Sequence, residues 1–504
     1  MSLHIESTEE ALAALKQQRV KNLAAAVSVS ALGVAMTGLL LYLANIITFL
    51  PEPPSIITYP LENQGPEEPD TPELVRKATR PSNSPAGQQV KVIASSTPLH
   101  IAVPIPDLEQ DAPTEEFFTG IEIGDGIAFD DGEGPGWDKP DTDVLSKRCD
   151  LNDRMKRITE NGGTPQCEEA VVKSLKWLQK QQNRDGSWGD GPQNYKCAMT
   201  GLSLLSYLAH CETPLSEDFG DTVLKGISFL VDQGMKSPVI SLVPQMNEVS
   251  YDHAIATYAL CEAYTFCKQM DIPSIANLEK VVIKAVDRII DAQCPNGGWA
   301  YSYNNKINPD IDLSVTGWNV QALKAAEHGG IKPTKGDIRS TLRKASSYVR
   351  KNVMPDGKFA YKENGNMPRS SLVGVGVLSL QMTGNGSDSA ARKGLDWIKN
   401  NVKTLQWGQG SGTENVKSNL YMHYYCVQAA MNRGGDVWTS YNKAFRDAVL
   451  SGQNADGSFR KNDVGYVSGM TGKSENIYRQ CLATLMLETY YRFLPGTGEG
   501  TKNS

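Results

Sequence analysis

Hydrophobic residues recur with helical spacing in six stretches of this chain, and each stretch begins with a lysine. The stretches start 49 to 60 residues apart and are Lys173–Leu178, Lys225–Leu230, Lys284–Ile289, Lys344–Val349, Lys393–Ile398 and Lys443–Ala448. Apolar residues at i, i+3 and i+4 predict amphipathic helices. A repeat of this length is one supersecondary unit that cannot bury its apolar face alone, so neighbouring units must stack.

A second, more uniformly apolar stretch follows in each repeat. These stretches are Ala198–Cys211, His253–Phe266, Val315–Ala326, Leu372–Gln381, Leu420–Met431 and Ile477–Tyr490. A helix that is apolar on most faces is a buried helix. We therefore predict an all-α fold, an α/α toroid of six helical hairpins and about twelve helices. Its outer ring is amphipathic and its inner ring lines a central cavity. An open helical solenoid is the alternative, although six long units suit a closed ring better.

Four repeats also carry a turn in which glycine is followed by an aromatic residue. The turns are Asp185–Trp188, Asn296–Trp299, Asp356–Phe359 and Asp456–Phe459, and the repeat at Lys393 keeps only Gln406–Gly408. Asp or Asn before Gly is typical of tight turns, because Gly tolerates positive φ and the Asx side chain bonds nearby backbone. The aromatic side chain can then pack back under the hairpin.

The lysine stretches and glycine turns together resemble the QW motifs of the squalene cyclase and protein prenyltransferase superfamily. Lys173 through Trp188, with Gln179, Gln182 and Gly186, matches nearly the whole motif, and the later copies match in part. The resemblance spans roughly residues 151–494 and implies the α/α toroid of that superfamily. The sequence from Tyr251 to Arg492 is also similar to uncharacterised membrane-anchored bacterial members of this superfamily. This second resemblance implies no known activity.

The catalytic motifs of that superfamily are broken here. Cyclases protonate an alkene with an Asp-x-Asp-Asp motif. The most similar segment of this chain is Asp310-Ile-Asp312-Leu313, which lacks the last aspartate. Prenyltransferases bind zinc through Asp-x-Cys and a distant His, and a catalytic zinc needs three such ligands. At the matching positions this chain has Asp312, Ser314 and Met422. We therefore expect neither a metal nor a cofactor, and whether the chain is an enzyme stays open. If it is one, the resemblance favours a terpene cyclase-like isomerase or lyase.

Three residues are candidate catalytic groups. Asp312 precedes an inner helix and would be the acid, with His253 or His423 assisting. An ordinary helix cap is the simpler explanation of Asp312, and a hydrogen-bonded core residue is the simpler explanation of each histidine. Candidate binding residues are the aromatics expected along the cavity, Tyr251, Tyr258, Trp318, Tyr421, Tyr424, Tyr425 and Tyr478. Such a lining suits an apolar ligand or a carbocation, and core packing is the alternative.

The N-terminal part of the chain has a different composition. Leu23–Leu50 is an uncharged run of 28 residues, longer than the ~20 needed to span a bilayer, and we interpret it as a transmembrane anchor. Lys16, Arg19 and Lys21 precede it, so the positive-inside rule leaves residues 1–22 in the cytoplasm. The rest would then lie on the periplasmic side of an inner membrane. Residues 51–145 hold 15 of the 27 prolines and 19 acidic against 5 basic residues, which predicts a disordered linker.

Charge and cysteine content add little. Residues 146–504 carry a net charge of +7 within a chain of net charge −7, with no dense basic stripe, so we expect no nucleic-acid partner. We place the toroid at residues 146–494 and a disordered tail at 495–504. All nine cysteines lie from Cys149 onward, and Cys149 with Cys167 is our first choice for a disulfide.

Three functions remain open at this point. The first is a membrane-anchored protein that binds or transforms an apolar isoprenoid-type lipid in the cavity. The second is a scaffold for envelope proteins. The third is a glycan-active enzyme, because α/α barrels also cleave glycans with a pair of carboxylates about 5–10 Å apart.

Overall fold

The computed structural model describes residues 148–492, with gaps at 192–194, 246, 304–309, 363–365, 409–416 and 462–471. Each gap falls between an outer and an inner helix of the same repeat. The predictions for residues 1–22, 23–50, 51–145 and 495–504 therefore lie outside the described residues. No helix in the described part of the chain is long and apolar enough to span a bilayer.

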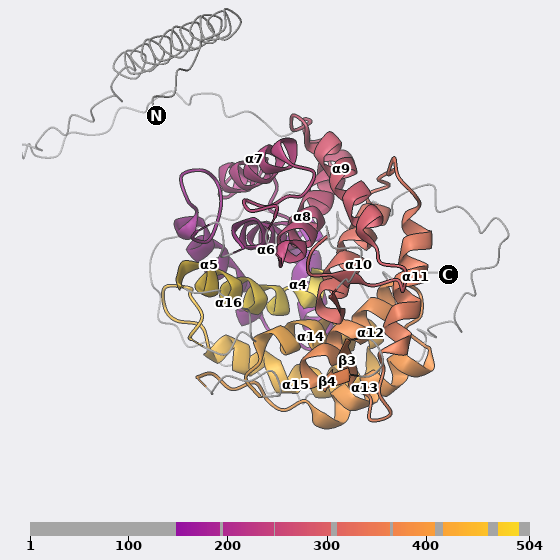
Figure 1. Ribbon diagram of the computed structural model, residues 1–504. Coiled ribbons are helices and arrows are strands. Elements are labelled where there is room, and N and C mark those ends of the chain that lie inside the picture. Colours follow the sequence, from indigo (N-terminus) through magenta and orange to yellow (C-terminus); the bar gives the residue numbers. More distant parts are fainter. Residues whose placement is uncertain are drawn as a thin grey trace, which may run out of the picture. The chain divides into compact units, whose positions relative to one another are not determined.

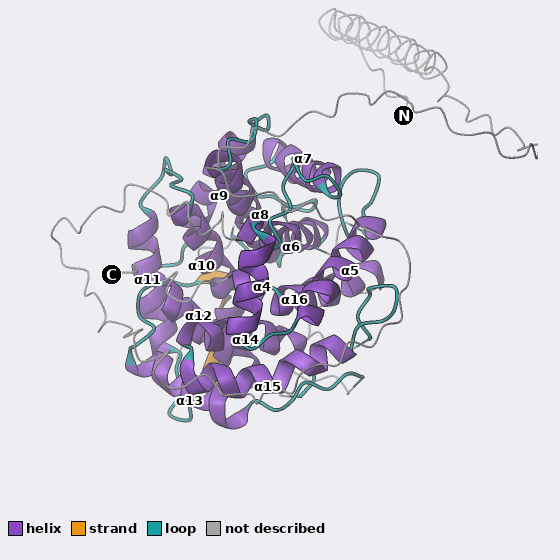
Figure 2. Ribbon diagram, turned by 180° about the vertical axis from the view of Figure 1, so that it is seen from behind, coloured by secondary structure: helices purple, strands orange, loops and turns teal. Residues whose placement is uncertain are grey.

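The described residues are almost entirely helical (Figures 1 and 2). Six helices contain the lysine stretches, namely α5 (Pro165–Gln181), α7 (Gly220–Lys236), α9 (Leu278–Ala292), α11 (Ile338–Lys351), α13 (Ser389–Asn401) and α15 (Gly435–Ser451). They alternate with α6 (Lys196–Ala209), α8 (Val249–Gln269), α10 (Leu313–His328), α12 (Val373–Met382), α14 (Leu420–Arg433) and α16 (Gly472–Leu487). The short helices α4 (Leu151–Glu160) and α17 (Thr489–Arg492) flank this series.

The even-numbered helices α6 to α16 form a closed inner ring. Each contacts the next one in the series, and α16 contacts α6. Neighbouring inner helices run parallel, because the first turn of one meets the first turn of the next: Tyr251 in α8 contacts Ser314 in α10. Nearly every residue of these helices is buried, whereas the odd-numbered helices keep an exposed face. The predicted α/α toroid of six hairpins is therefore present in residues 148–492.

The repeated glutamine of the sequence motif joins one repeat to the next. The Gln182 amide donates to Gly186 O within its own turn and to Thr222 O of the following repeat, both at 2.9 Å. Gln293 makes the equivalent pair of bonds. In the last repeat Gln453 donates to Ala170 O of the first repeat, at 2.7 Å. The same residue type thus links adjacent repeats and closes the ring.

The turn glycines have a related structural role. Gly186, Gly297, Gly357 and Gly457 all have φ between +85° and +99°. A Cβ atom at Gly297 would collide with the carbonyl oxygen of Lys344, the lysine that opens the next lysine stretch. The other three glycines face the equivalent lysines, and Gly457 faces Lys173 of the first repeat. Glycine is required at these positions by both backbone conformation and close approach.

Two small hairpins lie among the connections that enter the inner helices, and β3 and β4 are labelled in Figure 1. In the first, β1 (Trp299–Ala300) is antiparallel to β2 (Ile311–Asp312), with Trp299 opposite Asp312. In the second, β3 (Phe359–Lys362) is antiparallel to β4 (Asn366–Arg369), with Phe359 opposite Arg369. A 3₁₀ turn at Ser370–Leu372 leads into α12. These hairpins place residues just after the turn motif beside the inner-helix N-termini.

Two details differ from the sequence predictions. The disulfide joins Cys149 to Cys211, not to Cys167, which is a buried free thiol. Cys167 lies inside α5, whereas Cys211 follows the end of α6. The last inner helix also ends earlier than predicted, at Leu487. The Glu488 carbonyl accepts from the amides of both Tyr491 and Arg492, which starts the separate helix α17.

Candidate functional site at the ring mouth

Asp312 is the residue around which the candidate site is built. It ends β2 and is the N-cap of α10, and its side chain is fully buried. Its Oδ1 atom accepts from the amides of Ser314, at 2.6 Å, and Val315, at 3.1 Å. The Ser314 hydroxyl donates to the same oxygen. The helix-cap role that the sequence predicted as an alternative is thus present, and it occupies one of the two carboxylate oxygens.

Two arms of hydroxyl groups extend outward from this carboxylate. On one side the Tyr251 hydroxyl lies 2.7 Å from Ser314 Oγ. On the other side the Tyr301 hydroxyl donates to Asp312 Oδ2 at 2.9 Å, and it also bonds the Tyr361 hydroxyl. An ionised carboxylate only accepts hydrogen bonds. With Asp312 ionised, Ser314 and Tyr301 donate inward, so Tyr251 and Tyr361 donate to them in turn.

The direction of these bonds determines what the site offers to a ligand. The hydrogens of Tyr251 and Tyr361 are then used within the network, so each hydroxyl can offer a ligand only its remaining lone pairs, as an acceptor. Both side chains are partly exposed, as is Tyr301. Burial raises the pKa of Tyr251 and of Tyr361, and the nearby Asp312 carboxylate raises both further. The phenols therefore stay neutral at physiological pH.

Tyr421 offers a hydrogen-bond donor, whereas Tyr251 and Tyr361 offer acceptors. It lies in the first turn of α14, and its hydroxyl is buried without a hydrogen-bond partner among the described residues. Burial raises the pKa of Tyr421 well above its ordinary value, and the nearby Tyr478 and Asp312 add to this shift. The Tyr421 hydroxyl is therefore a neutral donor beside Ser314, where it makes no hydrogen bond of good geometry with the described residues. We call Tyr251, Tyr301, Asp312, Ser314, Tyr361 and Tyr421 the ring mouth.

Aromatic side chains below the ring mouth contact one another across the ring. Trp318 of α10 stacks on Tyr424 of α14, with ring centroids 5.8 Å apart, and meets Tyr425 edge-on at 5.5 Å. Gln321 of α10 donates to the Tyr425 hydroxyl at 3.0 Å. Because α12 separates α10 from α14 in the ring, these contacts pass through its interior. Tyr478 of α16 is also buried. The centre of the ring at this level is therefore occupied by the chain's own side chains.

The opposite end of the ring contains charged residues that the sequence did not single out. Arg492 is buried, donates to Tyr258 at 3.0 Å and to Glu262 at 3.1 Å, and lies over the Tyr258 ring. Arg148 forms a longer ion pair, 3.8 Å, with the same glutamate. Glu488 is fully buried, and neither of its carboxyl oxygens has a hydrogen-bond partner among the described residues. We call Arg148, Glu262, Glu488 and Arg492 the floor cluster.

The two candidate histidines lie away from the ring mouth. His253 Nδ1 accepts from the Ile240 amide at 2.9 Å, and its Nε2 lies 3.1 Å from Ala285 O. Burial lowers the pKa of His253 to about 3, so it is a neutral core residue. His423 Nδ1 lies 2.7 Å from the Tyr441 hydroxyl of α15, on the outer side of α14. Neither histidine joins the Asp312 network.

Two other aspartates near Asp312 in the sequence or on the neighbouring helix bond elsewhere among the described residues. Asp310 is exposed and pairs with Lys362. Asp252 is buried in the first turn of α8, where it accepts from the Ala198 amide of α6 and the Ser241 hydroxyl, and burial raises its pKa to about 6. In the described part of the chain, no group of three His, Cys, Asp or Glu side chains is placed to hold a metal ion.

Tyr301 and Tyr361 are the site residues that the sequence prediction missed. Each comes two positions after the aromatic residue of a turn motif, in Trp299-Ala-Tyr301 and Phe359-Ala-Tyr361. This repeated tyrosine was a usable signal, because equivalent positions in a ring of repeats lie at the same end of the ring.

Comparison of the sequence with protein-family models gives no match, and comparison with curated proteins gives none either. Solved structures do match. One is the GH76A alpha-1,6-mannanase from Salegentibacter sp. HEL1_6, with a TM-score of 0.48, 11% identity, and coverage of 64% of this chain and 98% of that chain. Another is the type II terpene cyclase MstE from Scytonema in complex with geranylgeranyl dihydroxybenzoate, with a TM-score of 0.41, 11% identity, and coverage of 68% and 100%.

The cellobiose 2-epimerase from Spirochaeta thermophila DSM 6192 also matches, with a TM-score of 0.46, 11% identity, and coverage of 64% of this chain and 96% of that chain. These proteins share the α/α toroid and differ in chemistry. The function of this chain has to be argued from its own side chains.

Proposed function

We propose that the ring mouth binds a ligand rich in hydroxyl groups, and that this ligand is a carbohydrate. The observation that carries the proposal is the pairing of two acceptor hydroxyls, Tyr251 and Tyr361, with the Tyr421 donor, which makes no hydrogen bond of good geometry among the described residues. An alcohol both donates and accepts, so neighbouring hydroxyls of one sugar satisfy both kinds of group. Partly exposed tyrosine rings offer the apolar faces that such a site also needs.

The same geometry gives less support to a lipid held deep in the ring. Trp318, Tyr424 and Tyr425 occupy the interior with contacts of their own. A cyclase acid must also be protonated to attack an alkene, whereas Asp312 accepts four hydrogen bonds that favour its ionised form. Burial outweighs these hydrogen bonds and raises the pKa of Asp312, so the protonation of Asp312 does not decide between the two ligands.

Binding is better supported than hydrolysis. Glycoside cleavage uses two carboxyl groups across the scissile bond. In residues 148–492 as described, Asp312 is the only carboxylate that hydrogen-bonds the mouth tyrosines. We therefore propose a glycan-binding role without assigning a reaction.

The proposed location is the outer side of a membrane, with Leu23–Leu50 as the anchor and residues 51–145 as a linker. The uncharged run supports the anchor. The Cys149–Cys211 disulfide supports an oxidising compartment, because cytosolic thiols are kept reduced.

The test uses the full-length chain in mild detergent with cellotetraose, chitotetraose and farnesol as probes, and binding is followed by tryptophan fluorescence. Removing one hydroxyl by Tyr421→Phe should weaken saccharide binding about tenfold, as expected for a lost hydrogen bond of about 1.4 kcal/mol. Tyr264→Phe is the matched control, since its hydroxyl bonds Glu279 outside the ring mouth. Binding of farnesol but of neither saccharide would return the preference to the lipid.

A further inference from the structure

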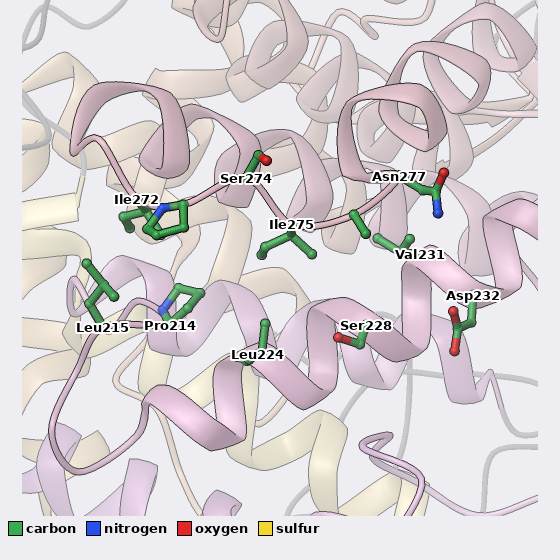
Figure 3. A pocket seen from close by; sticks show the side chains of 12 residues that line it. Pro214, Leu215, Leu224, Ser228, Val231, Asp232, Ile272, Ser274, Ile275 and Asn277 are labelled. Carbon is green, nitrogen blue, oxygen red and sulfur yellow. The ribbon is translucent and has the colours of Figure 1, made fainter.

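A groove with a volume of about 490 Å³ lies on the outer surface, apart from the ring mouth. Figure 3 shows its two walls. One wall is helix α7, and the other is the connection between α8 and α9. The side chains used below are Leu215, Leu224, Val231, Asp232, Ile272 and Ile275.

The groove has an apolar centre that is open to solvent. Leu215 is 61% exposed and Leu224 is 39% exposed, two of the few large apolar side chains in the described residues that face water. Leu224 and Val231 lie on the same side of α7 by their spacing, and Ile275 lies on the opposite wall (Figure 3). An open apolar groove with polar surroundings is typical of an interaction site.

Acidic residues outnumber basic ones along the chain that forms the α7 wall, and Asp232 lines the groove itself. Residues 212–224 and 271–279 contain no lysine or arginine, but the exposed Lys225 follows directly and lies on the same side of α7 as Asp221 and Asp232. The acidic residues of these two segments are Glu212, Glu217, Asp218, Asp221, Asp271 and Glu279. Asp221 and Asp232 are both exposed and share the helix side of Leu224. They are eleven residues apart, which corresponds to roughly 16 Å along the helix.

The second wall is suited to an extended partner. Residues 272–275 have no regular secondary structure. In the described part of the chain, the backbone groups of Ser274 make no hydrogen bond with other backbone groups. A peptide in extended form can therefore bond the backbone of Ser274 while its side chains enter the groove, although Pro273 has no N–H and the Ile275 carbonyl already accepts from Leu278.

We propose that this groove binds an extended segment of a partner protein that has basic residues at both ends and apolar residues between them. Alternate side chains of an extended segment point to the same side, and each residue advances about 3.3 Å. Basic residues at positions 1 and 7 then lie ~20 Å apart, within reach of Asp221 and Asp232 because lysine side chains are long. Apolar residues at positions 3 and 5 fall against Leu224 and Ile275.

The test measures the anisotropy of a fluorescent probe peptide, Lys-Ser-Leu-Ser-Leu-Ser-Lys, with the full-length chain at low salt. Two control peptides replace both lysines by glutamate or both leucines by serine. We expect each control peptide to bind at least tenfold more weakly than the probe peptide, a difference of about 1.4 kcal/mol or more.

The decisive variant is the double change Asp221→Lys and Asp232→Lys, which should reverse the preference so that the glutamate peptide binds better than the lysine peptide. Leu224→Ser should weaken both. Asp396→Lys, an exposed aspartate on α13, is the matched control and should change neither.

Two results would overturn the proposal. One is an unchanged preference for the lysine peptide in the double variant, which would place its binding elsewhere. The other is a concentration-dependent dimer of the unmodified chain that Leu224→Ser abolishes, which would assign the groove to a second copy of this chain.

Discussion

Replacing Glu488 by glutamine should stabilise the protein at neutral pH, and by more as the pH rises. The Glu488 carboxyl is fully buried, and neither oxygen has a hydrogen-bond partner among the described residues. Burial raises its pKa well above the ordinary 4.5, although Arg492 and Arg148 oppose the shift. Two further carboxylates, Glu168 and Glu262, add to it.

The sign follows from proton binding. Above pH 4.5 the unfolded chain releases the Glu488 proton, while the folded chain keeps it up to its raised pKa. The free energy of unfolding therefore falls with rising pH in this window, by about 1.4 kcal/mol per pH unit from this single group. Glutamine has no proton to release. The difference between Glu488→Gln and the unmodified chain should grow by the same ~1.4 kcal/mol per pH unit.

The assay is urea unfolding of the full-length chain in mild detergent, followed by far-ultraviolet circular dichroism at several pH values from 4.5 to 8. Glu262→Gln is the matched control from the same floor cluster, with the opposite sign. Burial raises the pKa of Glu262, but the Arg492 and Arg148 guanidiniums outweigh it and hold the pKa below 4.5. The ionised Glu262 carboxylate therefore adds to the free energy of unfolding above pH 4.5, and this stabilisation is lost as the pH falls through the lowered pKa. Glu262→Gln should thus destabilise the protein at pH 7. A pH-independent effect of Glu488→Gln would refute the reasoning.

Three more predictions concern stability and use the same unfolding assay. Asp312→Ala should cost about 2–4 kcal/mol, because it removes a helix cap and leaves buried donors unpaired, and an unchanged urea midpoint would contradict this. Gly297→Ala should cost more than 1 kcal/mol, because it adds a collision at a positive φ, whereas Gly330→Ala, with a positive φ but open space, should cost less. Cys149→Ser should cost up to about 4 kcal/mol, the loop-closure value for 62 residues, and equal stability of this variant and the unmodified chain under oxidising conditions would show that the bond contributes little.

The ring could be predicted from the sequence because its determinants are repeated. Lysine, glutamine and glycine recur at equivalent positions, and each has a contact with the neighbouring repeat, as Gln182 and Gly297 illustrate. The second hairpin, α7 and α8, contains the stretch at Lys225 and lacks the glycine turn. It was found only because its apolar periodicity matched the others. Repetition therefore carried more information than any single motif.

The site was predicted less completely. Asp312 was recognisable, since a carboxylate just before an apolar helix is a typical cap. The sequence could not show that the two histidines lie apart from Asp312, because a residue on an all-buried helix can face the ring interior or an outer helix. Both His253 and His423 face an outer helix. Tyr301 and Tyr361 were missed because short hairpins, not helices, bring them to the ring mouth. The disulfide depends on the proximity of a residue just before α4 to the end of α6, which no local pattern encodes.

The Cys149–Cys211 bond also has a mechanical consequence. Cys149 is among the first described residues, and the cysteines are 62 positions apart. Tension applied through residues 1–147 would otherwise act first on the ten-residue helix α4 and then on α5. The covalent bond instead transmits this tension to the end of α6. The residues between the two cysteines, roughly 210 Å of chain when extended, are then protected from unravelling. Under load, the toroid should therefore yield as a unit when oxidised and repeat by repeat from its N-terminal edge when reduced.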